Sequence, residues 1–171
     1  SQSSVTGIIQ DNKGYIWFAT QEGLNRYDGY NIKHYKQNPR DSLSLSNNYI
    51  ASMMKDSHGR IWIGTMIGGI SRYNPKLDIF NNFYYQKENT NSISSNRIYD
   101  IYEDSEKNIW IGTENGLNKY DSANNKFIHF QYQDTGQKNI ADNIIRTIYE
   151  KSKGDFLIGT NSTKLFFSKK S

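Results

Sequence analysis

The chain has 171 residues, a net charge of +4 and no cysteine. The lack of cysteine excludes disulfides, zinc–thiolate sites and cysteine nucleophiles. The scattered basic residues predict a solvated surface and no nucleic-acid partner. No apolar run is long enough to span a membrane, and no signal-peptide pattern is present. We therefore expect a cytosolic chain, or a processed or excised piece of a longer one.

The composition favours an all-β fold. Aromatic residues make up 14% of the chain, with 13 Tyr, and Asn and Ser are abundant between the apolar stretches. Short aromatic strands separated by such turn-forming residues are typical of β proteins.

The first predicted strand recurs four times, and its alignment gives two adjacent apolar columns. The strands lie at residues 5–11, 50–56, 98–104 and 145–151. The columns contain Ile8, Met53, Ile101 and Ile148, followed by Ile9, Met54, Tyr102 and Tyr149. Neighbouring side chains of a strand point to opposite faces, so we expect both faces of each sheet to be covered.

The second predicted strand carries the most conspicuous motif, Ile-Trp-Ile-Gly-Thr at residues 61–65 and 109–113. Its aromatic position is occupied by Trp17, Trp62, Trp110 and finally Leu157, at spacings of 45, 48 and 47 residues. Turns containing Asp11, Asp56 and Asp104 precede the first three copies. Small residues close each copy, and a small residue inside a strand predicts close approach of a neighbour; these are Ala19, Gly64, Gly112 and Gly159.

Two further strands complete each repeat. The third is predicted at residues 24–28, 70–74 and 117–121, and the more polar fourth at 31–35, 79–83 and 126–130. Long Asn- and Ser-rich connections follow at 36–48, 85–96 and 131–143. Each connection contains a short echo, read as residues 42–44, 92–94 and 139–141.

A repeat of four antiparallel strands with a period of 45–48 residues predicts the blades of a β-propeller. A β-sandwich would not repeat with aligned columns, and a parallel β-helix repeats at a shorter period. The predicted segments are blade 1 at 1–48, blade 2 at 49–96, blade 3 at 97–143 and an incomplete, three-stranded blade 4 at 144–171. Propellers typically need four to eight blades to close, so we expect a propeller fragment. Two copies pairing into a larger ring, a homodimer, is one hypothesis for covering its open faces.

The stretch at residues 101–121 resembles the two-component-regulator propeller repeat. It reads Ile-Tyr-Glu-Asp, then Ile-Trp-Ile-Gly-Thr, then Gly-Leu-Asn-Lys-Tyr-Asp. The resemblance implies the periplasmic sensor region of a hybrid two-component system histidine kinase of Bacteroidetes, an inner-membrane protein. It also implies the partners, which are the remaining propeller blades and a β-sandwich domain, and an oligosaccharide derived from a glycan as ligand. The family's rings are usually seven-bladed.

Few residues of the sequence suggest a catalytic or metal-binding site. His34, His58 and His129 are predicted to lie on outer strands or in a turn, away from other metal-type ligands. The Asp turns resemble the Asp-box of sialidase-like propellers, which is a fold element. No Ser/His/Asp set, phosphate loop or paired carboxylates are evident, so we expect no catalytic residue, no metal and no cofactor.

One basic column recurs on the third strand, formed by Arg26, Arg72 and Lys119. These side chains could bind an anion. Because each belongs to a separate repeat, the more economical interpretation is pairing with acidic residues of the same blade or the next.

The candidate ligand site lies in the loops that do not repeat closely. The turns after the second and fourth strands share one face, and long irregular loops concentrate function. Amides and an Arg just before the inner strands suit sugar hydroxyls, although these Asn residues could also be plain turn formers. The candidates are Asn47, Asn48, Asn96, Arg97, Asp142 and Asn143.

The leading hypothesis is therefore a non-enzymatic ligand-sensing segment that signals to a histidine kinase. A protein-interaction scaffold, including self-association, is the alternative. A propeller lyase or sialidase-like enzyme would need convergent acid and base residues that this sequence does not display.

Overall fold

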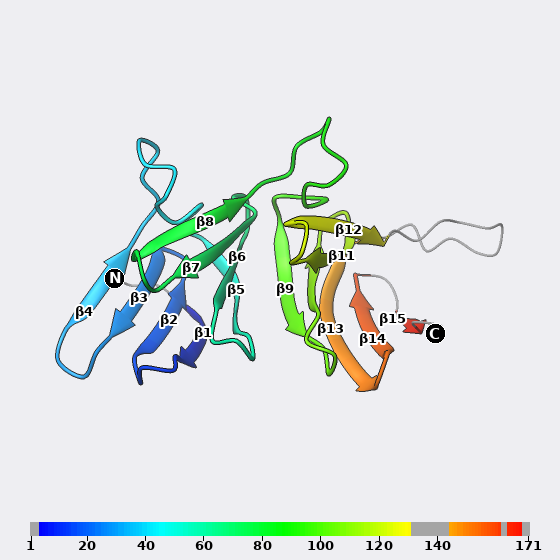
Figure 1. Cartoon of the computed structure of the whole chain (residues 1–171), viewed down its shortest axis with the longest axis horizontal. Helices are drawn as coiled ribbons and strands as arrows, with labels where there is room; N and C mark the ends of the chain where they lie inside the picture. Colours follow the sequence, from blue (N-terminus) through cyan, green and yellow to red (C-terminus); the bar gives the residue numbers. More distant parts are fainter. Residues whose placement is uncertain (1–3, 131–143, 162–163, 169–171) are drawn as a thin grey trace.

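The computed structural model describes residues 4–130, 144–161 and 164–168, the last of these as backbone only. The chain folds into four antiparallel sheets in which the strands follow one another in sequence order, with four strands in each of the first three sheets and three in the last (Figure 1). The all-β prediction and the incomplete last blade are confirmed. The described ranges contain no helix with the length and apolarity needed to cross a membrane.

The strands of each blade fall inside one of the four predicted segments. Blade 1 contains β1 (Val5–Gln10), β2 (Ile16–Thr20), β3 (Gly23–Tyr27) and β4 (Ile32–Tyr35). Blade 2 contains β5 (Ile50–Lys55), β6 (Ile61–Thr65), β7 (Ile70–Asn74) and β8 (Ile79–Phe83). Blade 3 contains β9 (Ile98–Glu103), β10 (Ile109–Thr113), β11 (Gly116–Asp121) and β12 (Lys126–Phe130). Blade 4 contains β13 (Ile145–Ser152), β14 (Asp155–Thr160) and β15 (Lys164–Ser168).

The blades stand side by side, and the first strand of each blade contacts the first strand of the next, from β1 through β5 and β9 to β13 (Figure 1). The connections after β4 and β8 both emerge at the upper end of the blades in this view. This shared end is the loop face on which the candidate ligand residues were predicted.

Each pair of neighbouring blades encloses its own apolar core, and a tryptophan of the earlier blade lies at its centre. Trp17, Trp62 and Trp110 are at most 1% exposed. Each ring meets an aromatic ring of the following blade at 4.7–5.1 Å between centroids: Tyr73, Tyr120 and Phe156. The prediction that these tryptophans fill the space between blades is confirmed.

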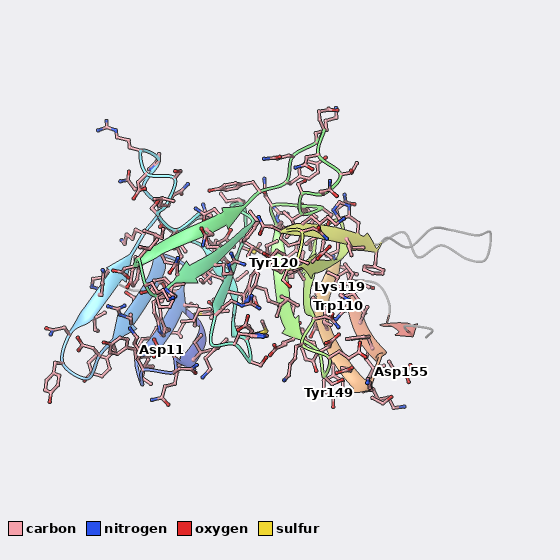
Figure 2. The ribbon with its side chains drawn as sticks, viewed as in Figure 1. Asp11, Trp110, Lys119, Tyr120, Tyr149 and Asp155 are labelled. Atoms are coloured by element: carbon pink, nitrogen blue, oxygen red, sulfur yellow. The ribbon has the colours of Figure 1, made fainter. Side chains whose placement is uncertain are left out.

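The expectation that both faces of every sheet are covered is wrong for the end blades. Ile101 and Ile148 are buried because each packs on the preceding blade, whereas Ile8 in the same column is 61% exposed. On the opposite face of blade 4, Tyr149 is 57% exposed (Figure 2). A blade face is covered only by its neighbour, so the first and last described blades each show one open face.

The small residues after the tryptophans mark close approach, as predicted, for two of the glycines. A Cβ on Gly64 would lie 2.6 Å from Ile98 Cγ2, and one on Gly112 would lie 2.8 Å from the Ile145 carbonyl oxygen. Both contacts come from the first strand of the next blade. At Gly159 the crowding atom belongs to Thr147 of the same blade. The close approach at Gly64 and Gly112 therefore belongs to a junction between two described blades, whereas that at Gly159 lies within the last described blade.

In the first long connection, the predicted short repeat at residues 42–44 lies two residues before the segment that matches residues 92–94 in the structure. Leu45, at 0% exposure, is the counterpart of Ile93, also at 0%, whereas Leu43 is 46% exposed. Ser44 and Ser92 cap equivalent loop nitrogens, those of Asn38 and Gln86. Residues 139–141 lie outside the described ranges.

Candidate functional site

The Asp turns are structural, and they bind the tryptophans directly. In each of the first three blades the indole Nε1 donates a 2.8–2.9 Å hydrogen bond to the turn carboxylate six residues earlier, on Asp11, Asp56 or Asp104. Burial alone would raise the pKa of Asp56, but hydrogen bonds from Trp62 and Arg60 outweigh it and lower that pKa. These carboxylates therefore stabilise the turn and the tryptophan of their own blade, and their oxygens are occupied by those hydrogen bonds.

Sequence reasoning missed this bond, although the fourth repeat carries the signal for it. There Lys151 stands in the Asp position and Leu157 in the Trp position. Donor and acceptor disappear together, as expected for two groups that bind each other.

The three histidines lie on outer strands or in a turn. His34 and His129 occupy the same register on β4 and β12, as predicted, opposite Asn25 and Asn118. The ring Nε2 of His129 is 2.6 Å from the Ser92 carbonyl oxygen. Within the described ranges, no three His, Asp or Glu side chains gather in a way that could hold a metal ion.

The junction between blades 1 and 2 neutralises its arginine. Arg26 donates a 3.0 Å hydrogen bond to the Tyr73 hydroxyl of the next blade, and its guanidinium lies 3.7 Å from the Asp78 carboxylate. Lys33 also pairs with Asp78, and the hydroxyls of Tyr35 and Tyr73 each donate to it at 2.7 Å. Burial would raise the pKa of Asp78, yet the bonds from Lys33 and the two tyrosines lower it to about 2. For Arg26, the prediction of pairing with an acidic neighbour is confirmed.

The junction between blades 2 and 3 repeats this geometry without the carboxylate. Arg72 donates a 3.0 Å hydrogen bond to the Tyr120 hydroxyl, which in turn donates to the Asn125 side-chain oxygen at 2.7 Å. Asn125 occupies the position of Asp78, and both have positive φ, 52° and 58°. Across the described ranges Arg72 takes part in none of the ion pairs found. For Arg72, the prediction of an acidic partner is wrong, because Asn replaces Asp.

The third member of the basic column has a different environment. The Lys119 ammonium lies 5.8 Å from the centre of the Trp110 ring (Figure 2). The strand pairing aligns Phe167 with the tyrosines at 73 and 120, and phenylalanine has no hydroxyl to accept a hydrogen bond. The column therefore does not converge on one anion, and each basic residue serves its own junction.

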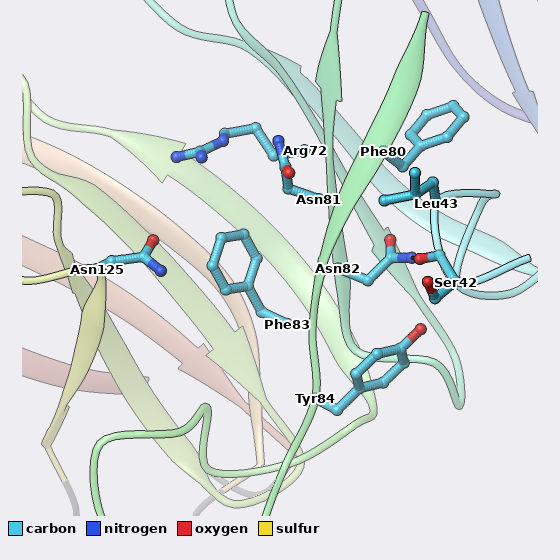
Figure 3. A pocket seen from close by; sticks show the side chains of 9 residues that line it. All are labelled: Ser42, Leu43, Arg72, Phe80, Asn81, Asn82, Phe83, Tyr84 and Asn125. Carbon is cyan, nitrogen blue, oxygen red and sulfur yellow. Dashed lines mark hydrogen bonds between the residues drawn. The ribbon is translucent and has the colours of Figure 1, made fainter. Parts of the chain in front are cut away.

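A groove opens beside Arg72, at the outer rim of the junction between blades 2 and 3 (Figure 3). Its volume is about 420 Å³, and its lining combines aromatic rings with amide side chains. Figure 3 shows Arg72, Asn81, Phe83 and Asn125 on one side of β8, with Leu43 and Tyr84 on the other. Sequence reasoning did not select this outer groove; the signal was the change from Asp78 to Asn125 within the repeat.

The predicted ligand residues on the loop face hold their own loops together. The side-chain oxygens of Asn48 and Asn96 each accept a 2.7 Å hydrogen bond from a loop nitrogen, that of Gln37 or Tyr85. Asn47 accepts a bond from the Tyr49 nitrogen at 2.9 Å. These oxygens act as turn formers, and ligand binding by these residues stays a prediction.

Arg97 joins blade 3 to the neighbouring turns. Its guanidinium pairs with Glu114 at 2.7 Å and donates to the Met66 carbonyl oxygen at 3.4 Å. Asp142 and Asn143 lie outside the described residues. The structure thus brings Asn96 and Arg97 to one short segment between blades 2 and 3, while Asn47 and Asn48 occupy the equivalent segment one blade earlier.

Comparison with known proteins gives a consistent family signal. Residues 1–22, 44–66 and 92–115 match the family model described as two component regulator propeller. A stretch of 46 residues is 52% identical to the protein named histidine kinase P4 of Formosa agariphila, covering 27% of this chain and 3% of that protein.

Solved structures share the blade arrangement. The extracellular domain of the hybrid two component system BT3049 from B. thetaiotaomicron superposes with a TM-score of 0.88 and 28% identity. The match covers 98% of this chain and 24% of that domain, so the chain spans about a quarter of its length. A virginiamycin B lyase from Staphylococcus aureus, at 16% identity, TM-score 0.63 and coverage of 93% of this chain and 49% of the lyase, shares the fold alone.

Proposed function

Because its first three repeats match the two component regulator propeller model, we propose that this chain is a ligand-sensing segment of a hybrid two-component sensor. The observation that carries the proposal is the match of nearly the whole chain to the extracellular domain of a hybrid two component system, at a TM-score of 0.88. The proposed location is extracytoplasmic, in the periplasm. The proposed output is a histidine kinase, as in the named relative from Formosa agariphila.

The proposed ligand is an oligosaccharide derived from a glycan. Support comes from the groove at the junction of blades 2 and 3, where aromatic rings and amide groups lie within about 420 Å³. Apolar rings with a few placed polar groups are typical of small-molecule sites. A ligand that contacts two blades at once binds more tightly to the arrangement of the blades in which both contacts can form. Such a difference in affinity between two arrangements is what signalling requires.

The test is direct binding. Isothermal titration calorimetry and thermal-shift measurements with a panel of neutral and acidic oligosaccharides should show saturable binding and a rise in Tm. Absence of binding and of any Tm shift across the panel would overturn glycan sensing by this segment.

The second candidate is a self-associating scaffold, and one observation favours it. The open faces at Ile8 and Tyr149 carry exposed apolar side chains at positions that neighbouring blades cover fully or in part elsewhere. The remaining blades of a longer sensor, or a second copy, would cover them. Light scattering at micromolar concentration tests whether a second copy covers these faces, because a stable monomer would contradict the pairing of two copies.

A further inference from the structure

We propose that the groove between blades 2 and 3 binds the carboxylate of an acidic sugar, and that Arg72 is the residue that holds it. The inference rests on the proposed function, because it assigns a chemical class to the ligand of the same sensing segment.

The guanidinium of Arg72 is held in a fixed position. It lies 5.4 Å from the ring centre of Trp62, 5.5 Å from that of Phe83 and 5.8 Å from that of Tyr120. The Tyr120 hydroxyl accepts one of its five N–H donors at 3.0 Å. Three rings and one hydrogen bond thus orient the planar group, and Figure 3 shows Arg72 with Phe83 among the residues that line the groove.

The groove supplies no carboxylate of its own among the described residues. The neutral side chains Asn81 and Asn125 lie where the preceding junction has Lys33 and Asp78. Arg60, the other arginine near Trp62, is already paired with Asp56 at 2.6 Å. Arg72 is therefore the cation of this groove whose charge is left for a ligand to balance.

The preceding junction shows which group fits beside such an arginine. There, the Asp78 carboxylate lies 3.7 Å from the Arg26 guanidinium and accepts the hydroxyl of Tyr73. Replacing this aspartate by Asn125 removes the charge while leaving the tyrosine hydrogen bond in place. A guanidinium binds a carboxylate with two parallel donors, so the carboxylate of a uronic acid can lie beside Arg72 and supply the negative charge that Asp78 supplies one blade earlier.

The rest of the groove suits a sugar ring better than a bare anion. On the same side of β8 as Arg72, Phe83 offers aromatic surface, and the amide of Asn81 offers both a donor and an acceptor. Rings and amides around one charged group match an oligosaccharide that carries one carboxylate per residue.

The test uses the whole chain and calorimetric titration with trigalacturonate, galactotriose and acetate. Trigalacturonate should bind the parent chain more tightly than galactotriose or acetate. Asn125→Asp places an internal carboxylate beside Arg72 and should weaken trigalacturonate by about tenfold or more, the effect of losing one charge-assisted contact. Ser122→Asp adds an equal charge in the same exposed turn, outside the groove, and should leave the affinity within about twofold.

Folding does not confound this test, because Asp78 already adopts the same positive-φ conformation in this chain. Unchanged trigalacturonate binding in Asn125→Asp would overturn the inference, and so would acetate binding as tightly as trigalacturonate. Binding of galactotriose without trigalacturonate would overturn the acidic class and leave the proposed function standing. If neither trigalacturonate nor galactotriose binds, both the inference about an acidic sugar and the proposed function are overturned.

Discussion

The junction between blades 1 and 2 and the junction between blades 2 and 3 use the same arginine, tyrosine and tryptophan but differ in charge. In the first, Asp78 balances Arg26 and Lys33; in the second, Asn125 leaves Arg72 with neutral partners. The shared residues explain why the blades stack with one geometry. The residue that differs shows how a repeat can keep its packing while one junction becomes available to a ligand.

Loss of a tryptophan should produce the largest effect and should separate the two junctions. Trp17→Ala and Trp62→Ala each remove a fully buried indole, which we expect to cost about 3–5 kcal/mol of stability. Because each tryptophan packs against the blade that follows it, Trp17→Ala should increase hydrogen exchange chiefly in blades 1 and 2, and Trp62→Ala chiefly in blades 2 and 3. Uniform loss of protection in both variants would contradict independent junctions.

Removal of the tyrosine hydroxyl should have a smaller effect that differs between the junctions. Tyr73 donates to the charged Asp78, so Tyr73→Phe should cost about 2 kcal/mol. Tyr120 donates to the neutral Asn125, so Tyr120→Phe should cost about 1 kcal/mol. Urea unfolding measures both values. Equal costs for the two variants would contradict the role assigned to Asp78.

The smallest effect is the pH dependence that belongs to the first junction alone. The folded state lowers the pKa of Asp78 from 3.8 to about 2, so its stabilisation is present above pH 4 and is lost as the pH falls toward 2. Asp78→Asn should therefore lose less stability than the parent chain between pH 4 and pH 2. Thermal melts across this range measure the stability of the parent chain and of the Asp78→Asn variant. The difference between the two removes the contribution of the other carboxylates, which both proteins share.

The converse variant gives the control. Asn125→Asp should create a similar acid-dependent contribution at the second junction, because it places a carboxylate beside Arg72 and Tyr120. If its pH profile between 4 and 2 matches that of the parent chain, the two junctions are not equivalent in geometry.

The sequence by itself determined the fold, because the same pattern of apolar, small and turn-forming residues recurs in each repeat. The recurrence of Trp17, Trp62 and Trp110 predicted the blades, and the strands lie within a residue or two of the predicted ranges. The small residues predicted a close neighbour, confirmed at Gly64 and Gly112. Such features depend on local spacing and alternation, which are readable along one chain.

The partners of these residues were decided only by tertiary structure. Arg72 reaches Tyr120 of the next blade, 48 residues away, and Asn125 replaces the acid that a sequence pattern would have supplied for pairing. The Asp56 carboxylate binds the Trp62 indole as well as its own turn, a bond invisible without side-chain geometry. A repeat specifies which residue types recur, whereas the charge left for a ligand depends on which of them meet across a junction.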